Sequence, residues 1–112
     1  MVAAHRVLRY LKSAPGQGLF LPAAGSLDLT AYSDADSAGC QFSRHSPTGY
    51  YIKLGGASVS WLAKKQRVVT RSFAETVYHA MASTTSEVLW LCFLHHELQV
   101  PQHALTPLYC DN

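Results

Sequence analysis

A Gly-Gly pair between two short apolar segments constrains the fold more than any other feature of the sequence. Residues Gly49–Leu54 and Ala57–Leu62 are each predicted to be a strand. Gly55 and Gly56 lie between them, and glycine adopts the positive φ angles that a two-residue hairpin turn requires. The sequence therefore predicts an antiparallel β-hairpin in the middle of the chain.

Two further elements are predicted before the hairpin. Val7, Leu8 and Leu11 recur at helical spacing, which indicates a short helix over Ala3–Lys12. Residues Leu27–Ser33 alternate between apolar and polar side chains, a pattern that is typical of a strand with one buried face. The chain therefore starts with a short helix, a connector and a first strand.

A long helix and a last strand are predicted after the hairpin. Ser72 followed by Glu75 forms a capping box, and Pro101 lies beyond the expected end, so the helix should cover Phe73–Leu98. Its expected buried face consists of Phe73, Val77, Met81, Thr84, Val88, Leu91 and His95. The last strand is Leu105–Cys110. A strand, a helix and another strand in this order favour a parallel crossover, and hence a mixed α/β sheet of about four strands.

The composition describes an ordered domain rather than a disordered or membrane-spanning chain. The 112 residues are one domain's length, and 48% are hydrophobic while only 14% are charged. A surface with so few charges favours burial against a partner. No apolar run is long enough to span a bilayer, so we expect no membrane partner. Three cysteines without metal-ligand spacing fit reduced thiols in a cytoplasmic or nuclear protein.

Two groups of residues are candidates for chemistry. Asp34 and Asp111 follow predicted strands, and sites in α/β sheets form at the carboxyl ends of parallel strands. If the strands are neighbours, the two carboxylates converge and suit Mg²⁺ together with a phosphate; the alternative is that both aspartates simply make turns. Four basic residues close in sequence form either a phosphate-facing patch or an ordinary solvated loop. They are Lys64, Lys65, Arg67 and Arg71.

Several motifs in this order resemble the ribonuclease H domain of copia-type retrotransposon polyproteins. They are Val7–Lys12, Tyr32–Cys40, Thr48–Tyr50, Val59–Trp61, Lys64–Gln66, Arg71–Glu75 and Tyr109–Asn112. The resemblance covers nearly the whole chain. It implies that residues 1–25 are a helix and connector that joins reverse transcriptase to ribonuclease H, and that residues 26–112 are a partial ribonuclease H-like domain.

The resemblance also implies an incomplete set of catalytic carboxylates. That family cleaves the RNA strand of RNA–DNA hybrids with two metal ions held by four carboxylates. Asp34 and Asp111 match the first and third of them, whereas Val77 stands at the position of the second. Glu75 is a further candidate, but two residues along a helix it faces away from Val77, and the Ser72 cap explains it better. The fourth carboxylate would lie beyond the last residue of the sequence.

Two functions are therefore expected from the sequence. The first is a transposon-derived, catalytically inactive domain that associates with itself or with a host protein, because an incomplete sheet leaves an edge and a face uncovered. The alternative is a residual Mg²⁺-dependent nuclease or hybrid-binding domain. In that case Asp34 and Asp111 would hold the metal, and the basic patch would hold the phosphates of an RNA–DNA hybrid weakly.

Overall fold

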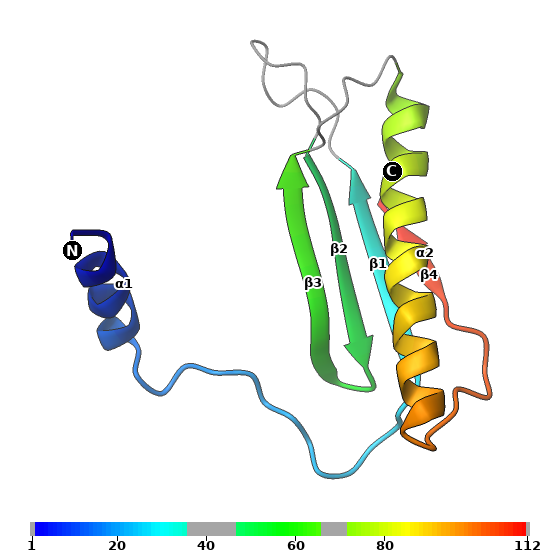
Figure 1. Ribbon diagram of the computed structural model, residues 1–112, viewed down its shortest axis with the longest axis horizontal. Helices are drawn as coiled ribbons and strands as arrows, with labels where there is room; N and C mark the ends of the chain where they lie inside the picture. The colour runs from blue at the N-terminus through cyan, green and yellow to red at the C-terminus, as the bar shows by residue number, and fades with distance from the viewer. Residues whose placement is uncertain (1, 36–46, 66–71, 112) are drawn as a thin grey trace.

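A computed structural model describes residues 2–35, 47–65 and 72–111 of the chain. In chain order the elements are α1 (Val2–Ser13), β1 (Leu29–Ala35), β2 (Pro47–Leu54), β3 (Ala57–Lys65), α2 (Phe73–Glu97) and β4 (Leu108–Cys110). The four strands form one sheet in the order β3-β2-β1-β4, and α2 lies across one of its faces (Figure 1). This is the mixed α/β fold, with one long helix and a short N-terminal helix, that the sequence predicts.

β1 is an inner strand of the sheet, with β2 on one side and β4 on the other. β1 pairs antiparallel with β2 and parallel with β4, and β2 pairs antiparallel with β3. The predicted parallel crossover is therefore confirmed, since α2 lies in sequence between β3 and β4 and packs against β1. Because β1 and β4 are parallel, their carboxyl ends lie at the same end of the sheet.

The predicted hairpin is present, and its two strands are longer than expected. β2 starts at Pro47 and β3 continues to Lys65. Gly55 has a φ of 56°, which lies in the left-handed region that glycine tolerates. Its backbone N–H donates to the carbonyl oxygen of Asp28 at 2.9 Å, so the turn is also tied to the segment before β1.

β1 lies two residues later than predicted, at Leu29–Ala35 instead of Leu27–Ser33. A local hydrogen bond replaces ladder pairing in the preceding residues, because the backbone N–H of Asp28 donates to the hydroxyl of Ser26 at 3.0 Å. The ladder with β2 begins only at Leu29. Asp34 is consequently a residue within the strand and not the first residue after it.

β4 is shorter than predicted, because only Leu108–Cys110 pair with β1. Pro107 has no N–H to donate and contributes only its carbonyl oxygen, which accepts from the N–H of Ala31 at 3.0 Å. Proline therefore marks the start of the strand, and residues 105–107 are not part of it.

The buried face of α2 agrees only in part with the predicted one, because Thr84 and Leu91 are buried as expected whereas other members of the predicted face are not. The residues of α2 that are buried are Thr76, Ala80, Thr84 and Leu91. Phe73 is 49% exposed, and Val77 is only half-buried. Three of the four buried side chains are small, which allows the helix to lie close to the sheet. A prediction based on the largest apolar residues therefore misses small buried residues such as Thr76 and Ala80, and it rotates the expected contact face slightly around the helix axis.

The core of the domain lies between α2 and the sheet. Leu29, Ala31, Ile52 and Leu91 form its buried cluster, and Leu108 of β4 packs against it. The opposite face of the sheet, which we call the open face, carries exposed side chains such as Tyr32, Tyr51 and Trp61.

α1 forms as predicted but stands away from the sheet, joined to it by residues 14–28 (Figure 1). The division into residues 1–25 and 26–112 stays a prediction. Among the described residues, neither helix combines the length and apolar character needed to cross a membrane.

Candidate functional site

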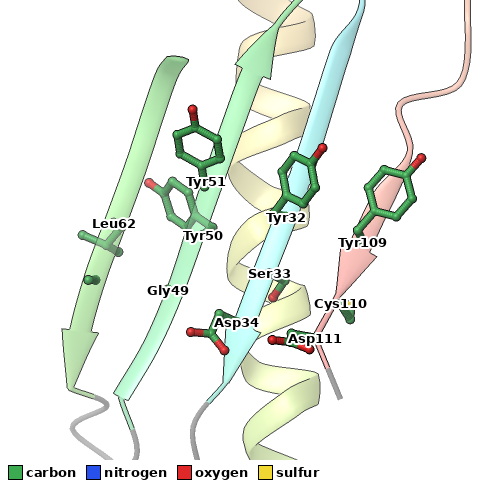
Figure 2. Close-up of a pocket in the computed structure, with 11 residues that line it drawn as sticks. Tyr32, Ser33, Asp34, Gly49, Tyr50, Tyr51, Leu62, Tyr109, Cys110 and Asp111 are labelled. Atoms are coloured by element: carbon green, nitrogen blue, oxygen red, sulfur yellow. The ribbon is translucent and has the colours of Figure 1, made fainter. Parts of the chain in front are cut away.

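Asp34 and Asp111 lie side by side at one end of the sheet. Exposure alternates along β1, so that Ser33 and Ala35 are buried toward α2 and Asp34 is exposed on the open face. Ser33 pairs with Cys110, and the N–H of Asp111 donates to the carbonyl oxygen of Ser33 at 3.2 Å. Both aspartates line one groove of about 590 Å³, which we call the acidic groove (Figure 2).

Aromatic rings form much of the rest of this face. Tyr109 stacks on Tyr32 with the ring centroids 5.4 Å apart, and Tyr32 meets Tyr51 at 6.1 Å. Trp61 is the ladder partner of Tyr51 on β3 and is 58% exposed. These four residues, one from each strand, are the aromatic row. All but Trp61 line the acidic groove together with the two aspartates (Figure 2).

Glu75 is not among the residues that line the acidic groove. It lies in the first turn of α2, where its backbone N–H donates to the hydroxyl of Ser72 at 3.2 Å. Its carboxylate is 3.9 Å from the imidazole of His79, one turn further along the helix. The N-terminal cap predicted at Ser72 is therefore present. Val77 does not line the groove either.

The predicted basic patch falls mostly outside what the structure describes. Arg67 and Arg71 are not among the described residues, and only the backbone of Lys65 is. Lys64 is exposed on β3 and pairs with Thr48. This register places Lys64 on the α2 side of the sheet, opposite the acidic groove. The proposed grip on phosphate therefore stays a prediction.

The two aspartates offer the oxygen ligands that a hard cation prefers. Mg²⁺ is commonly bound by one or two carboxylates, with substrate phosphates and water completing its shell. Asp34 within β1 and Asp111, the residue directly after β4, are a pair of this kind. Within residues 2–35, 47–65 and 72–111, no group of three or more His, Cys, Asp or Glu side chains is placed to hold a metal ion. The donor set thus fits one cation that shares its ligands with a substrate.

The aromatic row was not predicted as part of the site, although the sequence contains a signal for it. Tyr32 and Asp34 are two residues apart in a strand, so they must point to the same face. The register adds Tyr51 and Tyr109 beside Tyr32. Strand alternation could therefore have revealed Tyr32, whereas the other two depend on the pairing.

The surface of α2 that faces away from the sheet is also apolar. Leu89, Trp90 and Phe93 are 53%, 56% and 70% exposed. Leu105, in the connection from α2 to β4, is 98% exposed and lines a groove of about 540 Å³ with Leu89 and Phe93. We call these four residues the outer α2 patch. A helix that is apolar on all sides is normally buried, so this surface is a second candidate site.

The sheet order and the groove define a mixed α/β domain with one aspartate within β1 and another directly after β4, the neighbouring parallel strand. Homologues of this chain are found among retrovirus-related Pol polyproteins from transposons. The polyproteins from transposons RE1 and RE2 of Arabidopsis thaliana are each 44% identical over 110 residues. The match covers 98% of this chain but only 8% of each polyprotein, so the chain corresponds to a small part of them.

A further relative does not carry the name of a polyprotein. The secreted RxLR effector protein 161 of Plasmopara viticola is 49% identical over 89 residues, which are 80% of this chain and 63% of that protein. No protein-family model matches the chain, and no solved structure matches it either.

Proposed function

We propose that the chain is a transposon-derived ribonuclease H-like domain that does not hydrolyse RNA–DNA hybrids and acts through protein–protein association. The transposon polyproteins among its relatives support the origin. The order β3-β2-β1-β4, with Asp34 in β1 and Asp111 directly after the parallel strand β4, agrees with the fold that the resemblance implies. A relative that is named as an effector favours a role other than hybrid hydrolysis.

The side chains of α2 support the loss of hydrolysis. Val77 occupies the position at which the family has a metal-binding glutamate, and valine offers no ligand. Glu75 is held in the first turn beside His79 and does not line the acidic groove. Among the described residues, Asp34 and Asp111 are thus the carboxylates that line the groove. Removing one positioned catalytic group commonly costs a factor of about 10² or more in rate.

The observation that carries the association is the outer α2 patch. Trp90 and Phe93 are more than half exposed on the longest element of the fold, and Leu105 extends the apolar surface beyond the helix. Large exposed apolar patches mark interaction sites in soluble proteins. β4 has only three residues in the ladder, so its edge offers less for pairing than the sequence suggested. The preferred partner is a second copy of the chain, with a host protein as the alternative.

An assay of hybrid cleavage tests the catalytic half of this proposal. The chain is incubated with a labelled RNA–DNA hybrid and Mg²⁺ or Mn²⁺, beside Asp34→Asn and the control Asp28→Asn. We expect the chain to cleave no faster than Asp34→Asn. Val77→Glu should add little, because one further carboxylate still leaves fewer than the four that the family's mechanism uses.

Cleavage that disappears in Asp34→Asn and persists in Asp28→Asn would overturn the proposal. It would favour the second candidate, a residual nuclease, for which the convergence of Asp34 and Asp111 in one groove is the supporting observation. Binding of the hybrid without cleavage, measured by fluorescence anisotropy and weakened by Tyr32→Ala, would instead favour a hybrid-binding domain.

A further inference from the structure

α1 presents an apolar stripe to solvent. Val7, Leu8 and Leu11 lie on one side of the helix and are 57%, 63% and 58% exposed. The other side carries the cationic residues of the helix, and no acidic residue lies in its first turn. They are Arg6, Arg9 and Lys12. A short amphipathic helix is marginal in water by itself and gains most of its stability by packing its apolar side.

The open face of the sheet is the complementary surface. It carries the aromatic row, in which Tyr32, Tyr51 and Trp61 are 41%, 38% and 58% exposed. The connector from α1 already reaches this face, because Leu19 lines a hollow of about 450 Å³ together with Tyr51 and Trp61. The apolar stripe of α1 and the open face are therefore both exposed, and the segment between them touches the open face.

We infer that α1 docks its apolar stripe on the aromatic row of its own chain. Residues 14–28 join α1 to β1, and a flexible segment of this length has a mean end-to-end distance of roughly 20 Å and a limit of about 50 Å. It can therefore place α1 across the four strands.

Charge favours one direction of docking. Asp34 and Asp111 are acidic groups at one end of the open face, and Lys53 of β2 is a basic group nearer the other end. At 100° per residue, Lys12 lies about 40° beyond Leu8 and borders the apolar stripe of α1, whereas Arg6 and Arg9 lie on the far side of the helix. Docking toward the acidic end brings Lys12 near the two carboxylates.

Because residues 14–28 link α1 to the sheet, α1 of the same chain is favoured on the open face over α1 of a second copy. A short flexible linker holds its two ends at an effective concentration in the millimolar range, above that of a second copy at ordinary concentrations. The inference concerns the open face and goes beyond the proposed association, which uses the outer α2 patch. Either of the two can therefore fail without the other.

Exposure of Trp61 tests the inference on the full chain. Trp90→Phe leaves Trp61 as the only tryptophan. In that background, Leu8→Gln with Leu11→Gln removes the stripe, and Arg6→Gln with Arg9→Gln is the matched control on the cationic side. We expect Trp61 to be protected from acrylamide in the parent and in the control. The stripe variant should lose this protection and show a red-shifted emission, at every protein concentration. Far-UV circular dichroism checks that the sheet remains folded.

Two results would overturn the inference. One is quenching of Trp61 that is equal in the parent and in the stripe variant. The other is protection that fades on dilution of the parent, because it would show that α1 docks on another copy. Leu11→Ala, which keeps helix propensity, repeats the test if the glutamine variant unfolds.

Discussion

At the scale of single residues, Gln102 explains how the start of the central strand is held. Its Oε1 accepts the N–H of Leu29 at 3.2 Å, and its Nε2 donates to the carbonyl oxygen of Leu27 at 2.6 Å. The same Nε2 is 2.9 Å from Nδ1 of His95. Because the amide is oriented by its two backbone partners, Nδ1 of His95 has to be the acceptor. The side chain of Gln102 thus pairs with the backbone of Leu27 and Leu29, just before the residues of β1 that pair with β4.

Gln102→Glu should destabilise the domain by about 1–3 kcal/mol, because a carboxylate has no proton to donate to Leu27 or His95. Gln17→Glu makes the same chemical change at an exposed position and is the control. Urea unfolding measures the free energy, and hydrogen exchange of the Leu29 amide reports the local effect. Equal unfolding free energies for the two variants would show that the contacts of Gln102 contribute nothing.

How well the sequence predicts the arrangement of the site differs from residue to residue. Asp34 and Asp111 were predicted to converge, because the parallel pairing of their strands follows from the order of elements and the resemblance. Tyr51 and Tyr109 were not placed beside Tyr32, since their neighbours depend on the register between strands. Gln102 could not be foreseen, because its backbone partners are more than seventy residues away in sequence.

At the scale of elements, short sequence motifs predict correctly those features that depend only on neighbouring residues. The Gly55–Gly56 turn and the Ser72 cap each depend on a few neighbouring residues, and both are present. The buried face of α2 and the length of β4 depend on packing against other parts of the chain. For those two elements the sequence pattern was only partly correct, because Thr84 and Leu91 are buried as expected and β4 covers the second half of the predicted strand.

The hairpin provides a matched test of glycine. A Cβ at Gly55 would lie 2.1 Å from the carbonyl oxygen of Ser26, and the φ of 56° is unfavourable for other residues. A Cβ at Gly56 would meet nothing within 4 Å. Gly55→Ala should therefore lower the free energy of unfolding by about 1–3 kcal/mol or more, and Gly56→Ala by much less. Thermal unfolding of the two variants measures the difference, and similar melting temperatures would disprove the turn geometry.

At the scale of the whole molecule, the domain has one covered sheet face and two exposed apolar surfaces. The covered face lies under α2, where Leu29, Ile52 and Leu91 form the core. The open face and the outer α2 patch lie on opposite sides of the fold, because α2 separates the patch from the sheet (Figure 1). Docking of α1 would bury the open face, and association with a second copy of the chain would bury the outer α2 patch.

The oligomeric state of the chain tests the proposed association most directly. Phe93 and Tyr78 are both 70% exposed on α2, but Tyr78 lies fifteen residues earlier, roughly 20 Å along the helix, outside the outer α2 patch. Phe93→Glu places a charge in the patch, and Tyr78→Glu is the matched control. A specific interface should bury at least about 1,000 Å² in total, enough for a stable dimer.

Light scattering across the micromolar range is the deciding measurement. The account predicts that the parent chain and Tyr78→Glu form dimers or larger assemblies, and that Phe93→Glu is monomeric with an unchanged circular dichroism spectrum. A parent chain that stays monomeric at high micromolar concentration, or a Phe93→Glu variant that assembles as the parent does, would contradict it.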